Sequence, residues 1–436
     1  MKQYANVFTA YAIMIVLIIL VGVFQSWTVA LSILNFCLVS AVMTMGANIQ
    51  WGYAGLINFG IMGYTALGGL AAVLVSVAPV QEAWSVGGLD MIICLGIIVL
   101  MVFSIRYVLK KIKKSKKRNY IIAAIIIAGL IILRIIAGPA TEHIEAVNPA
   151  KTGFLGGLGM PILFSWIVGA FFAGGLAYIV GKVALGLRAD YLAIATLLIS
   201  EIVIAVIKHE DWLSRGVKNV NGLPRPVPYE IELQSKEWVL KVSDYLDTPI
   251  TELSSIMVKL SYSILFFAVL LIVLFLLEIA VKSPWGRMMR AIRDNEVSAN
   301  AMGKNIKQRH LQVFVIGSAI VGLAGAMLTT LDGQFTPVSY QPLRYTFLIW
   351  IMVIVGGSGN NFGSIIGGFL IWFFWVQSEP LGLWFISQIT THISDTNIIK
   401  SHLLENAAHI RLMFMGMILL ITLRFAPKGL IPEVKR

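Results

Sequence analysis

Residues Leu260 to Val281 read LSYSILFFAVLLIVLFLLEIAV and decide the class of fold. Glu278 is the one charged residue in this run. A helix of about 20 apolar residues crosses the hydrocarbon layer of a membrane, where no water is present to satisfy unpaired backbone groups. The run therefore predicts a membrane-spanning helix.

Runs of this kind recur along the chain of 436 residues, of which 58% are hydrophobic and 13% are charged. Because about a quarter of the residues of a soluble domain are charged, this composition excludes an ordinary soluble protein. The run from Phe8 to Phe24 has Lys2 before it and no small-residue cleavage pattern after it. We therefore expect a retained span rather than a removed signal peptide.

The predicted fold is all-α, a polytopic transmembrane helical bundle of about 10–12 segments that forms one domain over residues 1–436. An even number of crossings places both termini on one side of the membrane. The apolar runs predict twelve spans, at approximately residues 8–25, 28–47, 56–79, 89–109, 120–138, 160–181, 190–208, 260–281, 311–331, 343–356, 363–378 and 410–425.

The basic residues indicate the orientation. Most of the 34 Lys and Arg residues fall on the side of the termini, above all in RYVLKKIKKSKKR (106–118) and in the loop 282–309. Because cytoplasmic loops are enriched in Lys and Arg, we expect cytoplasmic termini. The run 106–118 also fits a lipid or nucleic-acid patch, but a topogenic loop is the simpler explanation. We expect membrane lipids, and no nucleic acid, as contacts of this chain.

The loop at about residues 209–259 is then an extracytoplasmic insertion. Its segment NGLPRPVP (221–228) contains three prolines, which exclude a regular helix. Residues 229–259 mix apolar and acidic side chains at rough helical spacing, which predicts an amphipathic helix at the outer surface. This helix either caps the bundle or forms a platform for an external protein.

Glycine is concentrated in NIQWGYAGLINFGIMGYTALGG (48–69) and in VGGSGNNFGSIIGG (355–368). Small residues let neighbouring helices approach closely, which is one explanation. Glycine-interrupted segments at matching places in two halves of a transporter also indicate broken helices along a substrate path. Glu201, an ionisable residue inside a predicted span, either lines such a path or is a structural carboxylate. The candidate path residues are Asn48, Gly52, Tyr53, Gly55, Asn58, Glu201, Gly356, Gly357 and Gly359.

Motifs of the common enzyme classes are missing from the sequence. It contains no P-loop, no H-E-x-x-H and no G-x-S-x-G. Cys37 and Cys94 lie far apart in apolar runs, without metal-ligand spacing. We therefore expect no catalytic residue, no metal site and no cofactor in this chain.

A charged stretch, MRAIRDNEVSANAMG (Met289–Gly303), lies between two predicted spans on the cytoplasmic side. Asp294 is expected to cap a short helix with Glu296 in its first turn, and Gly303 to end it in the left-handed conformation. The helix has a small apolar side and is either a solvated connection or the docking element of a soluble partner. That apolar side comprises Ile292, Ala299 and Met302.

Residues 283–327, SPWGRMMRAIRDNEVSANAMGKNIKQRHLQVFVIGSAIVGLAGAM, resemble the loop and following helix of permease subunits of branched-chain amino acid (LIV-type) ABC importers, M-type. Four further stretches are similar in the same order. They are the segment 48–69; LGLRADYLAIATLLISEIV with the later NGLP; IMVIVGGSGNNFGSIIGGFLIW; and the ending RFAPKGLIPE.

The resemblance implies a pore-forming subunit in the inner (plasma) membrane of a bacterium. It implies four partners: a homologous permease in a heterodimer, two cytoplasmic ABC ATPases that use ATP and Mg²⁺, and an extracytoplasmic solute-binding protein. Its loop helix would dock in a groove of the ATPase and couple hydrolysis to transport. The coupling residues it implies are Arg290, Asp294, Asn295, Glu296, Ala299 and Gly303.

Two regions depart from the family pattern and look like insertions, namely the basic loop 106–118 with the apolar segment after it, and residues 225–259. Three alternatives in function stay open on sequence: a urea or amide permease of the same family, an ion-gradient-driven secondary transporter, and a membrane scaffold without solute flux. The charged cytoplasmic loop favours the ATP-driven importer over the last two.

Overall fold

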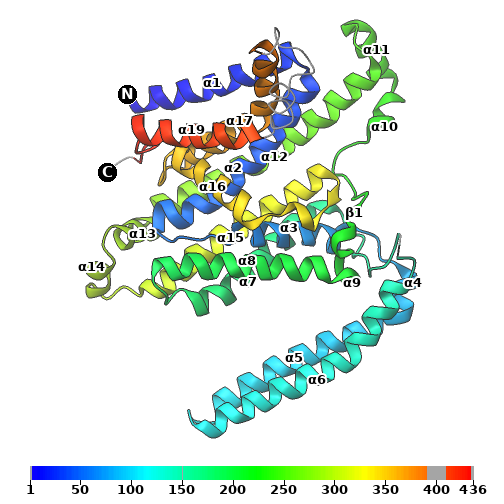
Figure 1. The fold of residues 1–436 in the computed structure, drawn as a ribbon, viewed down its shortest axis with the longest axis vertical. Coiled ribbons are helices and arrows are strands. Elements are labelled where there is room, and N and C mark those ends of the chain that lie inside the picture. The colour runs from blue at the N-terminus through cyan, green and yellow to red at the C-terminus, as the bar shows by residue number, and fades with distance from the viewer. Residues whose placement is uncertain (1, 150, 390–408, 434–436) are drawn as a thin grey trace.

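The computed structural model describes residues 2–149, 151–389 and 409–433, and most of the chain in these ranges is helical (Figure 1). The predicted all-α class is confirmed. Lys435 and Arg436, two of the basic residues used to predict the orientation, lie outside the described residues.

Each of the twelve predicted spans corresponds to one helix. In the described part of the chain, nine helices are long and apolar enough to cross a membrane, α3 and α16 are shorter apolar helices, and α19, with 16 residues, belongs to neither group. The twelve are α1 (Lys2–Phe24), α2 (Trp27–Ala54), α3 (Ile61–Ser76), α5 (Leu89–Lys111), α6 (Lys116–Ala146), α7 (Ile162–Ala184), α8 (Ala189–His209), α12 (Ile250–Lys282), α15 (Ile306–Asp332), α16 (Pro342–Gly356), α17 (Asn361–Ile389) and α19 (Ile410–Phe425).

The third predicted span, 56–79, begins too early. Helix α2 continues to Ala54, the chain then turns at Gly55 with a φ of 72°, and α3 starts only at Ile61. Hydropathy does not detect this break, because the residues between the two helices are mostly apolar. The glycines of this stretch thus include one that interrupts the helix as well as others that pack helices together.

Helix α15 packs against α2, α3 and α7, and α3 also packs against α7, so that α15 forms the centre of the bundle. Their contacts depend on glycine. A Cβ on Gly68 of α3 would collide with the carbonyl oxygen of Gly322 on α15, and one on Gly325 would collide with the carbonyl oxygen of Thr65. Without a hydrophobic driving force between helices in lipid, such close backbone packing supplies much of the association energy.

Helices α1, α12, α16 and α17 pack around α2, and α19 packs against α17 and α16. The helices α5 and α6 form a hairpin that stands apart from it (Figure 1). This hairpin is attached at its base, where Trp212 donates its backbone N–H to Glu145 and Ile144 packs with Ala83 and Leu155. The base is built from α4 (Gln81–Ala83), the π-helical turn η1 (Trp84–Gly88) and α9 (Asp211–Ser214).

The predicted amphipathic helix over 229–259 is wrong in its extent. Two short helices, α10 (Glu230–Gln234) and α11 (Glu237–Leu246), occupy its first part, and residues from Ile250 belong to α12. Asp247 has a φ of 49° and Pro249 precedes α12, so the helix cannot run through. The stretch 221–228 is non-helical as predicted. The turn η2 (Gly216–Lys218) leads into β1 (Val220–Asn221), which pairs antiparallel with β2 (Gln334–Phe335), before the turn η3 (Pro337–Ser339).

Figure 1 shows the two sides of the bundle. Both marked chain ends lie on the side of α13 (Pro284–Asp294) and α14 (Glu296–Ala301), as does the turn between α5 and α6. The opposite side carries α4, α9, β1, α10 and α11. This arrangement agrees with an even number of crossings.

Substitution of Gly68 by Leu should destabilise the protein, because the side chain would force α3 away from α15. We expect a loss of about 3 kcal/mol, the upper end of overpacking effects, measured as a lower thermal midpoint in detergent. Gly175→Leu on α7 is the matched control, since an added Cβ there meets nothing within 4 Å. Equal midpoints for the two variants would contradict the proposed packing.

Candidate functional site

Helix α13 begins at residues that strongly favour the start of a helix. Ser283 accepts a hydrogen bond from the Trp285 backbone at 3.2 Å, and Pro284 occupies the first turn, where its missing N–H costs nothing. Met289 and Ile292 are 0% and 1% exposed and hold the inner face of the helix against the bundle. The helix is therefore fixed to the membrane helices and is not a solvated linker.

Helix α14 follows after one residue of extended backbone. Asn295, and not Asp294 as predicted, is its N-cap and accepts the Ser298 backbone N–H at 2.9 Å. Asp294 is instead the last residue of α13, where the α-helical backbone cannot act as a cap. Glu296 stands in the first turn of α14, and Gly303 has a φ of 73° just after it, both as predicted.

The outward surface of α14 mixes polar and apolar side chains. Val297 is 80% exposed and Met302 is 78% exposed, and Glu296 beside them is also exposed. Ala299 is buried at 9% together with Ile292, so of the predicted apolar side only Met302 faces outward. Two large apolar side chains are thus exposed near a carboxylate on this short helix.

Arg293, the penultimate residue of α13, connects this element to the rest of the site. Its guanidinium donates to the carbonyl oxygen of Gly52 at the end of α2 and forms ion pairs with Asp294 at 3.0 Å and with Glu433 at 2.9 Å. Burial by itself lowers the pKa of Arg293, but the two carboxylates more than compensate and raise this pKa above its ordinary value. The arginine is therefore a permanently charged link between three segments.

The loop after α16 closes against the same place. Asn48 of α2 accepts the Gly359 backbone N–H at 2.9 Å and donates to Asn361 at 3.3 Å. Asn361 in turn donates to Glu278 at 3.0 Å, and Glu278 pairs with Lys282 at 2.9 Å. A chain of polar contacts thus runs from α2 through the start of α17 to the end of α12.

Glycine makes these contacts possible. A Cβ on Gly52 would collide with the Asn48 side chain and the Gly359 backbone, and one on Gly359 would lie 3.0 Å from Glu433 and 3.2 Å from Arg293. The end of the chain pairs here as well, because the Leu430 and Ile431 backbones donate to the carbonyl oxygens of Val355 and Gly356. A Cβ on Gly357 would block this pairing by meeting the Ile431 carbonyl.

The break between α2 and α3 is held by a second polar cluster. Asn58 donates to Gln50 at 2.9 Å, and Gln50 donates to the Phe314 carbonyl at 2.9 Å and to Ser318 at 3.0 Å. Trp350 of α16 donates to the Asn58 carbonyl. Gly55 is exposed, but residues 56–60 are buried or half-buried, so most of the interrupted backbone lies inside the protein, where irregular backbone is tolerated in a membrane protein.

The structure thus brings two groups of candidate residues together. Most of the candidate path residues lie in or beside the two polar clusters, and the first cluster meets the candidate coupling residues through Arg293. Tyr53 is buried at 4% beside this junction, and Arg290 is partly buried on α13. Glu201 is the exception, because its side chain is exposed on the outside of α8.

Sequence reasoning gave no role to Arg293, Gln50, Asn361 or Glu433. Glu433 belongs to the quoted ending RFAPKGLIPE, so the signal was present, but its partner is distant in sequence. The direction of each side chain decides these roles, and hydropathy carries no information about it.

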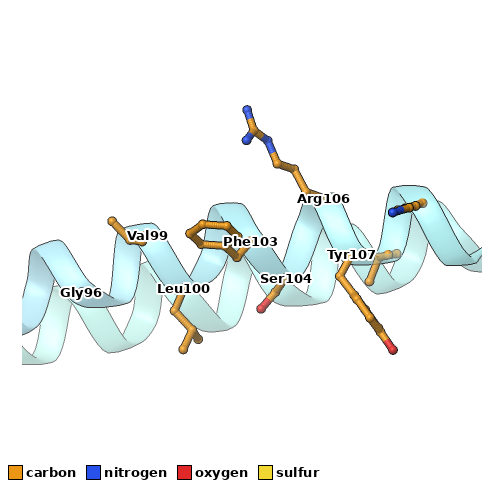
Figure 2. A pocket seen from close by; sticks show the side chains of 9 residues that line it. Gly96, Val99, Leu100, Phe103, Ser104, Arg106 and Tyr107 are labelled. Carbon is orange, nitrogen blue, oxygen red and sulfur yellow. The ribbon is translucent and has the colours of Figure 1, made fainter.

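A surface hollow of about 780 Å³ lies along α5, away from these clusters. Figure 2 shows its lining residues projecting from that one helix in different directions, with Arg106 opposite Tyr107. Because no polar groups converge there, the hollow does not have the features of a solute site.

Comparison with known proteins supports the class of protein that the sequence motifs indicate. A family model described as "Branched-chain amino acid transport system / permease component" matches residues 150–423. "Probable branched-chain amino acid transport permease protein LivM" of Methanocaldococcus jannaschii is 25% identical over 302 residues, 68% of this chain and 74% of that protein. "High-affinity branched-chain amino acid transport system permease protein LivM" of Escherichia coli is 23% identical over 272 residues, 60% of this chain and 56% of that protein.

A shorter match of 105 residues, 28% identical, covers 24% of this chain and 32% of "Probable branched-chain amino acid transport permease protein LivH" of M. jannaschii. No solved structure is significantly similar to the chain. The bundle of long apolar helices defines a polytopic membrane protein. The chain belongs to the family of permease components of branched-chain amino acid transport systems, and within it resembles the M-type proteins.

Asn48→Ala should loosen the loop after α16, because the Gly359 N–H and the Asn361 amide both lose a buried partner. We expect a cost of about 1–3 kcal/mol, measured as a lower thermal midpoint in detergent. Ser32→Ala on the same helix is the control, since the Ser32 hydroxyl bonds only to the Thr28 carbonyl of its own helix. If the two variants melt alike, Asn48 does not hold the loop.

Proposed function

We propose that the chain is the translocating permease of an ATP-driven importer of branched-chain amino acids, and that it moves solute by alternating access. The observation that carries the proposal is the position of Arg293, which ties α13 to the glycine-rich segments at the ends of α2 and α16. Separate ATPase subunits supply the energy, with ATP and Mg²⁺ bound to them and not to this chain.

In this mechanism α14 is the docking element for an ATPase. Its exposed residues Val297 and Met302 enter a groove on the partner, and Glu296 beside them adds a polar contact. Gly303 and Asn295 fix the two ends of the helix, so that it moves as a rigid body. Ala299 packs on the inner side, toward α13.

Motion of α14 then passes through α13 to Arg293. The guanidinium pulls on the Gly52 carbonyl and on Glu433, which flank the loop held by Asn48 and Gly359. Displacement of this loop changes the angle between α2, α16 and α17. A short, charged and partly buried link is suited to this task, because charge-assisted hydrogen bonds are stronger than neutral ones.

The proposed orientation puts α14 and both termini in the cytoplasm of a bacterial cell, with the chain in its inner membrane. The excess of Lys and Arg on this side supports it. On the opposite face, α10, α11 and the β1–β2 pair are available to an extracytoplasmic solute-binding protein. The similarity to both LivM and LivH proteins supports a homologous permease as the second membrane subunit.

Two substitutions in the docking element should uncouple the complex. We expect Glu296→Lys and Gly303→Pro to lower ATPase activity stimulated by the loaded binding protein about tenfold, equivalent to about 1.4 kcal/mol of lost coupling. The measurement uses the full complex in proteoliposomes. Glu142→Lys, a charge reversal at an exposed position of α6, is the control and should leave stimulation unchanged.

The same proteoliposomes test the class of transporter. Uptake of leucine, isoleucine or valine should require ATP on the side of the membrane that carries the ATPases. It should not require an ion gradient. Uptake by the purified chain alone under a gradient would overturn the proposal in favour of a secondary transporter. Uptake of urea or amides in place of the amino acids would show that the proposed substrate class is wrong, but it would leave the proposed ATP-driven mechanism unchanged.

A further inference from the structure

One face of α8 presents an acidic residue to the outside of the bundle. The inner face of the helix is buried, with Thr196 and Ser200 at 1% and Ile204 at 1% exposure. The outer face is apolar apart from Glu201, which is exposed near its middle. The large apolar residues of that face are Tyr191, Ile194, Leu198, Ile202 and Val206, each about half exposed or more.

Glu201 lies at membrane depth. With a rise of 1.5 Å per residue, it is about 18 Å from Ala189 and about 12 Å from His209, the two ends of α8. The hydrocarbon layer is about 30 Å thick, so neither end of the helix brings this carboxylate to the interface. A glutamate side chain is also too short to reach water from there by snorkelling, unlike lysine or arginine.

Glu201 also has no hydrogen bond or ion pair within the described part of the chain. Two other carboxylates of the long helices are paired, Glu278 with Lys282 and Glu379 with Arg411. A carboxylate that faces lipid without a partner is costly, and intramembrane acidic residues almost always face protein or a water-filled cavity. This face of α8 is therefore incomplete in the isolated chain.

We propose that this outer face of α8 packs against the homologous permease subunit, which supplies a cation or a hydrogen-bond donor to Glu201. The inference rests on the proposed function, because it takes the second permease as its occupant. Ala205, one helical turn after Glu201, is exposed on the same face and permits close approach of a partner helix.

Charge complementarity favours a different chain over a second copy of this one. A two-fold contact between two copies through this face would place the two Glu201 carboxylates near each other, and like charges in a medium of low dielectric repel strongly. A non-identical partner can offer a donor at the same depth. The outer face of α8 therefore favours a heterodimer over a homodimer.

The proposed interface lies one helix away from the break between α2 and α3. The Thr196 hydroxyl accepts the Phe59 backbone N–H at 3.0 Å, and Ser200, next to Glu201, would lie 2.9 Å from a Cβ on Gly63 of α3. A shift of α8 caused by the partner therefore reaches the interrupted segment directly. Glu201 acts here as a positioning residue at a subunit contact.

The test uses the full complex of the chain with the homologous permease and the ATPases. A photo-reactive benzoylphenylalanine at Leu198 or Ile202 should cross-link to the homologous permease. The same group at Phe275, which is 65% exposed on α12, is the control and should give no such product. Cross-links from α8 to a second copy of this chain, to an ATPase or to lipid alone would each overturn the proposal.

Substitution of Glu201 gives an independent measurement. Glu201→Leu should reduce the amount of homologous permease that co-purifies about tenfold, whereas Glu201→Gln should retain most of it, because an amide still accepts a hydrogen bond. The thermal midpoint of the isolated Glu201→Leu chain should not fall, since leucine is preferred in lipid, and this separates lost assembly from misfolding. Unchanged co-purification of Glu201→Leu would overturn the proposal.

The two proposals fail in different ways. In one outcome, the wild-type chain binds the homologous permease and the ATPases while α8 gives no cross-link to that permease. In that case the proposed importer is retained and the proposed interface on α8 is wrong. If no second permease co-purifies with the wild-type chain, the heterodimer itself is wrong, and the interface with it.

Discussion

The guanidinium of Arg293 joins three segments that are far apart in sequence. It contacts the carbonyl oxygen of Gly52 at the end of α2 and the carboxylates of Asp294 and Glu433. The approach is possible because Gly55 and Gly359 leave no Cβ in the way of the Arg293 side chain. This one charge therefore links the end of α13 to the end of α2 and to the segment that contains Glu433. A lysine would carry the charge but lacks the planar fork that serves several acceptors at once.

Much of the fold could be predicted from the sequence, because each span has to satisfy its own backbone in lipid. All twelve apolar runs became helices in the predicted order. The break at residues 55–60 was missed, since Leu56, Ile57 and Phe59 are as apolar as any helix. The extent of the helix predicted over 229–259 was wrong because Asp247 and Pro249 end one helix and begin another, a local backbone effect that spacing did not reveal.

The candidate site, like the fold, could be predicted in part from the sequence. Residue types and their spacing identified α14, Gly303 and the glycine-rich stretches, because glycine and capping residues act locally. They did not identify Arg293 with Glu433 or Asn48 with Asn361, pairs that only the tertiary fold creates. The cap at Asn295 instead of Asp294 is an error of one residue, of the size expected when two adjacent side chains are both good caps. Glu201 was found by its charge, but its direction, outward from α8, needed the structure.

In the described part of the chain, the hairpin of α5 and α6 contacts the rest of the protein mainly through its base, near Ile144, Glu145 and Trp212. Its two helices bury their contact surface mainly against each other. Because this unit has so few contacts with the central helices, it could be gained, lost or exchanged in evolution without repacking the glycine-rich centre of the bundle.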